Sequence, residues 1–194
     1  SFGGVWKVDT NALMLTRAGG ADSRRLSAKT KWELPYISRL GELYRLFASL
    51  QTDAYWVDEV VENDAPDNRI SGVSGRVFPQ VGLEWKLPLA RRDGRFTQIV
   101  EPIASFIMAP SSQNPDRIPN EDSLSFEFDD TNLFSVNRFG GIDRIEGGSR
   151  FTYGLNNSVF GLNNGFSSFF IGQSYRFRQD NDFGTETGLD DHFS

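Results

Sequence analysis

The chain is 194 residues long and acidic, with 26 Asp and Glu residues against 20 Lys and Arg residues. The charges are interspersed, and no polybasic stretch offers the concentrated basic patch that a nucleic-acid partner requires. The absence of cysteine excludes disulfides and thiolate metal sites from these residues. No apolar run approaches the roughly 18 residues of a membrane-spanning helix. Aromatic residues make up 13% of the chain and glycine occurs 19 times, which favours an all-β fold.

Apolar and polar residues alternate along most of the chain, and this period of two predicts β-strands. The clearest stretch is YRLFASLQTDAYW, where even positions from Tyr44 to Trp56 are mostly apolar and odd positions such as Arg45 and Asp53 are mostly polar. Ser1 leads directly into such a pattern, so we expect an internal piece of a longer chain. We expect seven strands, near residues 2–17, 23–36, 42–57, 74–90, 95–109, 144–156 and 166–178.

Several of these strands exceed ten residues, against a usual length of about 5–6. Long strands suit a tilted, membrane-spanning β-barrel. Four prolines count against central strands, because proline cannot donate a hydrogen bond to the ladder. We therefore expect strand ends or bulges at Pro35, Pro79, Pro88 and Pro102.

The connections alternate in length, as they do in outer-membrane barrels with short periplasmic turns and long outer loops. Long connections are expected near 58–73 and 110–143, and short ones near 91–95 and 161–165. The connection at 18–22 would then be an outer loop, although it is short.

One face of the predicted strands carries charged and polar residues. This arrangement has two interpretations. A water-filled lumen is one, and a soluble sheet with one face in solvent is the other. The aromatic residues of the apolar face favour the lumen, because most of them lie toward strand ends, as a membrane-interface girdle would. The candidate girdle is Trp32, Tyr36, Tyr44, Trp56 and Trp85. The candidate lumen-lining residues are Lys29, Lys31, Glu33, Arg45, Gln51, Asp53, Arg76, Gln80, Glu84 and Lys86.

Catalytic signals are weak. The acidic cluster Glu127, Asp129 and Asp130 could supply paired carboxylates or a cation site, but a solvated loop explains it better. His192 is a lone histidine near the end of the sequence. No nucleophile elbow, Walker loop or zinc-binding His-Glu-x-x-His motif occurs. We expect no catalytic residue, metal or cofactor.

The run NPDRIPNEDSLSFEFDDTNLFSVNRFGGIDRIEGGSRFTYGL (114–155) resembles the C-terminal barrel domain of the LptD family, lipopolysaccharide-assembly proteins of the Gram-negative outer membrane. It is most similar to the alphaproteobacterial branch. FASLQTDAYWVDEV and RVFPQVGLEWKLPL also look similar to this family. In the family, a motif of Asn-Leu-Phe, then Gly-x-Asp-Arg, then a glycine a few residues before a strand marks a long outer loop that returns to the barrel. Its residues here are Asn132, Leu133, Phe134, Gly141, Asp143, Arg144 and Gly148.

The resemblance implies an antiparallel transmembrane β-barrel segment, with about seven strands of a barrel that has on the order of two dozen. Residues 1–194 would be a single piece of that barrel domain. The family has no enzymatic activity. Its barrel receives lipopolysaccharide from a periplasmic LptA-type bridge, through an N-terminal domain that this sequence lacks, and releases it to the outer leaflet. An LptE-like lipoprotein plugs the lumen. The implied partners are lipopolysaccharide, these two proteins and outer-membrane lipid, and the implied location is the cell outer membrane.

Glycine pairs flank an Asp-Arg step in this motif. We expect Gly140, Gly141, Gly147 and Gly148 to permit tight turns and close backbone approach at the barrel rim. Asp143 and Arg144 would tie the loop there by ion pairs and hydrogen bonds, the alternative being a surface turn without partners. For the whole chain, the alternatives are a porin or nutrient transporter, or a soluble β-rich protein such as a carbohydrate-binding module or a hydrolase.

Overall fold

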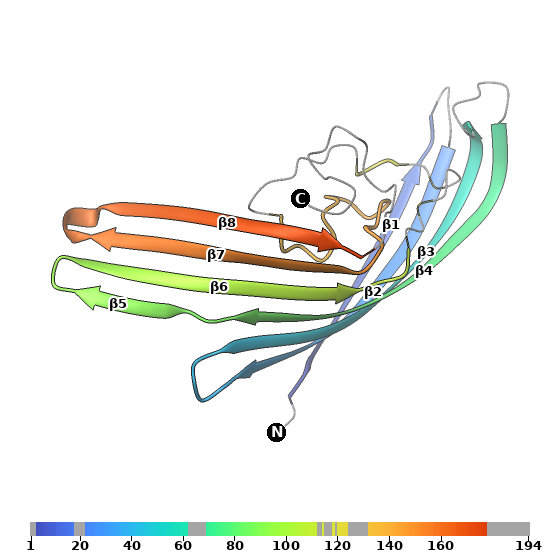
Figure 1. Ribbon diagram of the computed structural model, residues 1–194. Helices are drawn as coiled ribbons and strands as arrows, with labels where there is room; N and C mark the ends of the chain where they lie inside the picture. Colours follow the sequence, from blue (N-terminus) through green and yellow to red (C-terminus); the bar gives the residue numbers. More distant parts are fainter. Residues whose placement is uncertain are drawn as a thin grey trace.

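The computed structural model describes residues 3–17, 22–61, 69–111, 114, 118, 120–123 and 132–177. These residues form one antiparallel sheet of eight strands in the order β1-β2-β3-β4-β6-β7-β8, with β5 paired to β6 (Figure 1). The strands are β1 Val5–Leu15, β2 Asp22–Ile37, β3 Leu43–Val61, β4 Arg69–Lys86, β5 Leu89–Asp93, β6 Phe96–Met108, β7 Arg150–Gly161 and β8 Phe166–Arg176. The all-β, antiparallel fold class predicted from the alternation is therefore confirmed.

Three expected boundaries were wrong. The strand expected at 74–90 is interrupted after Lys86, and its continuation β5 keeps the same register against β6. The strand expected at 144–156 begins only at Arg150 and runs to Gly161. The long connection expected at 58–73 is shorter, because β3 continues to Val61 and β4 begins at Arg69, with a β-bulge after Val57 that accommodates the extra length.

Three of the four prolines lie inside strands, contrary to the expectation, at places where one side of the ladder is open. Pro35 lies beyond Glu33, where the pairing of β1 with β2 stops, and Pro79 lies before Val81, where the pairing of β4 with β6 starts. Pro102 of β6 lies opposite the break between β4 and β5 that contains Pro88. Since a proline has no N–H to donate, these open sides tolerate it at little cost.

The pairing register separates the side chains onto two faces. The apolar face carries Leu46, Leu50, Leu83, Phe106 and Leu155, all of which are exposed. The opposite, polar face carries buried polar side chains from β2 to β8. They include Arg25, Asp53, Arg76, Thr152 and Ser174.

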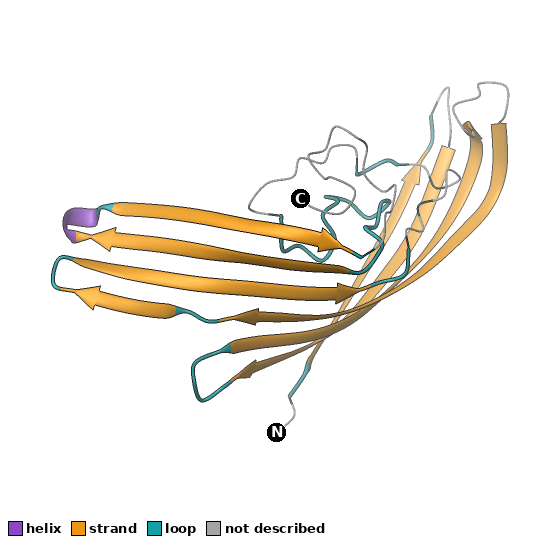
Figure 2. Cartoon of the chain, in the orientation of Figure 1, coloured by secondary structure: helices purple, strands orange, loops and turns teal. Residues whose placement is uncertain are grey.

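The connection between β6 and β7 covers part of the polar face. Its described residues 132–149 form neither helix nor strand (Figure 2) and lie in the angle between β1–β4 and β6–β8 (Figure 1). Leu133, Phe139 and Ile145 of this loop are buried, as are Phe47 and Phe78 of the sheet. The buried apolar side chains therefore lie between the loop and the polar face, while many large side chains of the apolar face are exposed.

Helix content is minimal. In the described ranges the one helix is the three-residue 3₁₀ turn Leu162–Asn164 between β7 and β8. No helix among these residues is long and apolar enough to cross a membrane.

Candidate functional site

The predicted lumen-lining residues all lie on the polar face. The register pairs Lys29 with Gln51 across β2 and β3, and pairs Asp53 with Arg76 across β3 and β4. Because facing residues of an antiparallel pair point to the same side of a sheet, the alternation of one strand extends across its neighbours. The structure thus brings the whole predicted set together as one surface.

One group of these residues forms a ladder of ion pairs near the short β2–β3 turn. The Glu33 carboxylate forms ion pairs with Lys7 at 3.2 Å, Lys31 at 2.8 Å and Arg45 at 2.8 Å. Arg45 also pairs with Glu84, which contacts Lys86 at 3.1 Å. The ladder crosses β1 to β4 and holds four cations against two carboxylates. The cationic side chains are partly exposed, so the ladder presents a net positive polar surface.

A second group is fully buried. Nε and Nη2 of Arg76 donate to Oδ2 of Asp53 at 2.8 and 2.6 Å. The Asp53 carboxylate also accepts hydrogen bonds from the Ser27 hydroxyl and from Gln51 Nε2. A buried ion pair is stable only when its remaining polar atoms are satisfied, and here neighbouring strands and the loop satisfy them.

The loop is anchored to this second group by Asp143. Nη1 of Arg25 donates to Oδ1 of Asp143 at 2.5 Å, and the Tyr55 hydroxyl donates to the same oxygen at 3.0 Å. Nη2 and Nη1 of Arg76 donate to the backbone carbonyls of Ile142 at 2.9 Å and of Asp143 at 2.8 Å. The expected ties of Asp143 are therefore present. Their sheet partners are Arg25, the fourth residue of β2, and Tyr55 and Arg76, which lie further inside β3 and β4.

Arg144 behaves differently from the expectation. Within the described ranges its guanidinium makes no ion pair, and the residue takes part through its backbone. Its N–H donates to the Ser123 hydroxyl at 3.4 Å, and its carbonyl accepts from Asn137 Nδ2 at 3.1 Å. Among the described residues, the aspartate of the Asp-Arg step supplies a side-chain anchor and the arginine does not.

Asp122, in the segment 120–123, binds the same part of the loop and the same arginine. Oδ1 of Asp122 accepts hydrogen bonds from the backbone N–H groups of Ile142 and Asp143, both at 3.0 Å, and Oδ2 accepts from Arg25 at 2.7 Å. Burial alone would raise the pKa of Asp122, but the hydrogen bonds from Asp143, Arg25 and Ile142 outweigh it and hold that pKa below its usual range. A hydrogen bond from Arg17 likewise lowers the pKa of Glu121.

A second anchor, at Glu146, lies three residues further along the loop and was not found from the sequence. Glu146 is fully buried and lies 3.3 Å from Nη1 of Arg150, 3.3 Å from Nη2 of Arg176 and 3.6 Å from Nε of Arg138. Burial lowers the pKa of Arg138 to about 10, so its guanidinium stays charged at neutral pH. The only signal in the sequence was the density of opposite charges between 138 and 150, which does not show that they converge.

Nη2 of Arg150 extends this anchor to the loop backbone. It donates to the carbonyls of Ser135 at 2.8 Å and Val136 at 2.7 Å. Nη2 of Arg138 donates to the Ser174 hydroxyl at 2.7 Å, which ties the loop to β8. The two anchors together fix the loop to β2, β3 and β4 on one side and to β7 and β8 on the other.

Of the remaining motif residues, Leu133 and Phe134 pack against β8, and Asn132 takes part in a turn. Leu133 contacts the backbone of β8 at Gly172, where a Cβ would lie 2.5 Å from its side chain. Phe134 meets Phe170 edge to face, with 6.2 Å between ring centroids. The Asn132 carbonyl accepts from the Ser135 N–H at 2.9 Å and so closes a tight turn.

The four glycines differ in what they do. Gly148 has a φ of +78° and donates to the Pro110 carbonyl at 2.7 Å, so it supplies a turn that other residues rarely adopt. A Cβ on Gly141 would lie 2.2 Å from Oδ1 of Asp122. Gly140 has no neighbour within 4 Å of such a Cβ, and neither it nor Gly147 has a positive φ. The expectation of a tight approach was therefore wrong for Gly140.

The candidate girdle lies on the apolar face. Tyr36, Tyr44 and Trp85 face one another across β2, β3 and β4 beside the short β2–β3 turn, and the Tyr36 and Tyr44 rings lie 6.1 Å apart. Trp56 lies twelve residues along β3 from Tyr44, which at ~3.3 Å per residue is about 40 Å. Trp32 lies four residues inward of Tyr36, opposite Trp6. The row of Tyr36, Tyr44 and Trp85 at one end and the single Trp56 at the other thus bracket an apolar stretch on β3, and Trp32 lies between these two levels.

Some predicted features fall elsewhere. Glu127, Asp129, Asp130 and His192 lie outside the described residues. Among the residues that are described, no group of three or more His, Cys, Asp or Glu side chains is placed to hold a metal ion.

Comparison with known proteins gives one consistent family. The model of the family LptD, described as LPS transport system D, matches residues 2–194. Relatives named LPS-assembly protein LptD include those of Idiomarina loihiensis, 27% identical over 141 residues, and of Acinetobacter baumannii, 36% identical over 104 residues. These matches cover 71% and 52% of this chain but only 17% and 12% of the relatives. A third, from Pectobacterium atrosepticum, is 26% identical and covers 87% of this chain and 23% of its own. The chain therefore spans about a fifth of the length of the curated relatives it matches.

Proposed function

Since the chain belongs to the LptD family, we propose that its sheet is part of the wall of an outer-membrane β-barrel that delivers lipopolysaccharide to the outer leaflet. The observation that carries this proposal is the division of one continuous sheet into an exposed apolar face and a polar face that bears charged side chains.

The apolar face has the properties of a lipid-facing surface. On β3 the stretch between Tyr44 and Trp56 spans about 40 Å, and a strand tilt of about 40° reduces this to roughly 30 Å across the membrane. That height is close to the apolar band of about 25 Å in barrels, which aromatic residues flank. Burial of this surface in lipid explains why so many large apolar side chains are exposed in the chain alone.

The polar face supports a hydrated lumen. The ion-pair ladder of Glu33, Arg45 and Glu84 offers partly exposed charges, while the anchored loop covers the part of the sheet nearer the long connections. Charged residues on the lumen side of a barrel strand avoid the penalty that they would incur in lipid. In this proposal the sugar chain of lipopolysaccharide passes along this polar face, and the acyl chains move along an apolar route.

The finer parts of the proposal follow from the family. The rest of the barrel, on the order of two dozen strands in all, would continue from the open edges of β1 and β8. An LptE-like lipoprotein would occupy the lumen, and a periplasmic LptA-type bridge would supply lipopolysaccharide. The protein would act in the cell outer membrane as a non-enzymatic conduit.

Depletion of the full-length protein in its own host tests this function. We expect newly made lipopolysaccharide to stop reaching the cell surface while its synthesis continues, because the conduit is removed after the synthetic steps. Resupply of the wild-type protein should restore delivery. Unchanged surface delivery would contradict the proposal, and loss of small-solute uptake in the same cells would instead favour a porin or nutrient transporter.

A further inference from the structure

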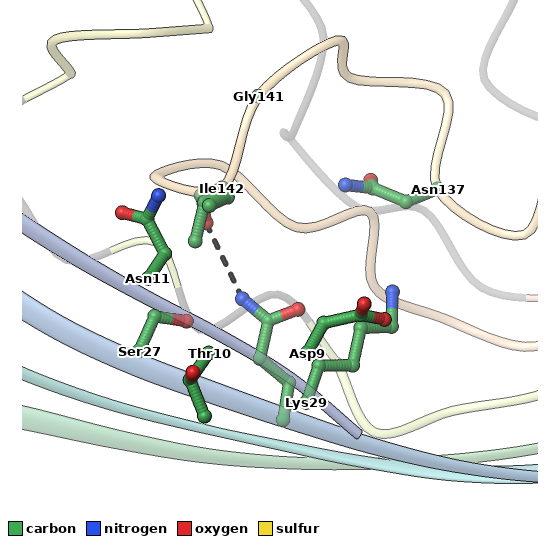
Figure 3. Close-up of a pocket in the computed structure, with 9 residues that line it drawn as sticks. Asp9, Thr10, Asn11, Ser27, Lys29, Asn137, Gly141 and Ile142 are labelled. Atoms are coloured by element: carbon green, nitrogen blue, oxygen red, sulfur yellow. Dashed lines mark hydrogen bonds between the residues drawn. The ribbon is translucent and has the colours of Figure 1, made fainter. Parts of the chain in front are cut away.

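A cavity of about 260 Å³ lies between the loop and the polar face, at the β1 end of the sheet. Figure 3 shows Asn137, Gly141 and Ile142 of the loop on one side of it, and side chains of β1 and β2 on the other. The sheet side is mostly polar. It consists of the polar-face residues Asp9, Asn11, Ser27, Lys29 and Gln51, together with Thr10, whose register places its side chain on the apolar face.

The loop side of this cavity is already satisfied by internal hydrogen bonds. Asn137 donates to the Arg144 carbonyl and accepts from the Glu146 N–H. The Ile142 carbonyl accepts from Arg76 at 2.9 Å. It also accepts from Gln51 at 3.4 Å, which is the dashed line in Figure 3. The loop therefore provides a fixed wall, which the anchors at Asp143 and Glu146 hold against the sheet.

The sheet side offers polar atoms that have no partner among the residues that the structure describes. Across the described ranges, the Lys29 ammonium makes no ion pair. Within the described part of the chain, Nδ2 of Asn11 and Oε1 of Gln51 also make no hydrogen bond, although the other polar atom of each amide is used. The Asp9 carboxylate makes no ion pair within the same ranges. The cavity thus presents two donor groups and two acceptor groups on one wall.

We propose that this cavity binds one sugar unit of the lipopolysaccharide glycan as it passes the polar face. A sugar ring carries hydroxyl groups that both donate and accept, and the wall of Asp9, Asn11, Lys29 and Gln51 offers both kinds of partner. The volume lies just below the ~300–1,000 Å³ of clefts that bind drug-sized ligands, which suits a single ring. An anion site is disfavoured because Asp9 balances the charge of Lys29.

The proposal rests on the function proposed above, and it assigns these four residues a binding role that the ion-pair ladder does not have. The test uses the full-length protein in lipid nanodiscs, and the probe is the glycan released from the host's lipopolysaccharide by mild acid. Saturation-transfer NMR measures its binding to the wild-type protein and to Lys29→Met and Asp9→Ala. Arg92→Met, which removes one cation from β5 far from the cavity, is the matched control.

We expect the released glycan to bind the wild-type protein and Arg92→Met equally, and to bind Lys29→Met and Asp9→Ala about tenfold more weakly, since each loses a charge-assisted hydrogen bond. Each variant must first show the heat-resistant electrophoretic mobility of the folded barrel. Absence of binding to the wild-type protein, or equal binding to all variants, would overturn the proposal. Displacement of the glycan by inorganic phosphate would also overturn it, because the cavity would then be an anion site.

These outcomes are separate from those of the depletion experiment. If surface delivery depends on the protein but the released glycan does not bind, only the sugar site is wrong. If delivery does not depend on the protein, the proposed function fails whatever the binding result.

Discussion

Arg25 of β2 and Asp143 of the loop lie 118 residues apart in the sequence and share a buried contact of 2.5 Å between Nη1 and Oδ1. Both side chains are almost fully shielded from solvent, and Tyr55 donates to the same carboxylate oxygen. This contact holds the β6–β7 loop against the polar face of the sheet.

Replacement of Asp143 by Ala should release the loop. The change leaves Arg25 buried with only its contact to Asp122 and its bond to Asn11, and removal of one partner from a buried ion pair typically costs about 3–5 kcal/mol. The measurement is the rate at which protease cleaves between 132 and 149 of the full-length protein in outer-membrane fragments. Arg144→Ala is the control and should leave this rate nearly unchanged, since its guanidinium makes no ion pair among the described residues. Equal cleavage of both variants would show that Asp143 is not the anchor.

Replacement of Glu146 by Gln should weaken the other anchor. The carboxylate is the shared contact of Arg138, Arg150 and Arg176, so its neutralisation leaves three guanidinium groups close together with less compensation. We expect a lower temperature of barrel unfolding, followed by heat-modified electrophoretic mobility. The same change at Glu101 of β6, which makes no ion pair in the described part of the chain, should have little effect. An unfolding temperature that falls equally for both would contradict the role of Glu146.

Gly141 and Gly140 make a matched pair because they are neighbours with opposite surroundings. A Cβ at Gly141 would lie 2.2 Å from Oδ1 of Asp122 and 2.5 Å from its backbone carbonyl, whereas one at Gly140 meets nothing within 4 Å. Gly141→Ala should therefore destabilise the docked loop by about 1–3 kcal/mol, and Gly140→Ala should be close to neutral. Hydrogen exchange of the loop amides in both variants measures the difference. Equal protection would mean that the segment 120–123 does not pack against Gly141.

Loop docking should weaken in acid. The folded pKa values of Glu121 and Asp122 lie below their unfolded values of about 4.3 and 3.9, so the stability they contribute is present above those values and is lost as pH falls through the folded ones. We expect protease access to the loop to be constant from neutral pH down to roughly pH 5 and to increase below roughly pH 4. An acid-tolerant protease such as pepsin gives this measurement at low pH. The Glu121→Gln variant should lose part of the pH dependence, and a wild-type transition near neutral pH would contradict the assignment.

Much of the sheet follows from local pattern. The alternation from Tyr44 to Trp56 predicts which side chains of β3 share a face, and the register then places Arg45 beside Glu84 and Asp53 beside Arg76. The interrupted strand at Pro88 and the short turn at Gly41, where φ is +86°, also have local chemical causes. The blurred pattern near Ile103 and Ile107 has a tertiary cause. These two side chains are buried on the polar face, where Phe47 lies over Gly82.

The loop could not be predicted in the same way. The convergence of Glu146 with Arg138, Arg150 and Arg176 depends on how residues far apart in the sequence fold over the sheet, and the start of β7 at Arg150 depends on the same contacts. The family motif predicted that Asp143 ties the loop, but it did not predict the partners Arg25 and Tyr55. The likeness to the alphaproteobacterial branch stays a prediction.

The orientation of the two faces of the sheet in the membrane can be measured on β2. Nitroxide labels at consecutive positions from Ala28 to Glu33 in the full-length protein, reconstituted in lipid, report contact with lipid-soluble oxygen or with a water-soluble relaxation agent. We expect oxygen contact at Ala28, Thr30 and Trp32 and contact with the water-soluble agent at Lys29, Lys31 and Glu33, with a period of two. Contact of both sets with water, or the opposite alternation, would contradict the proposal that this sheet is part of a barrel wall with its polar face toward the lumen.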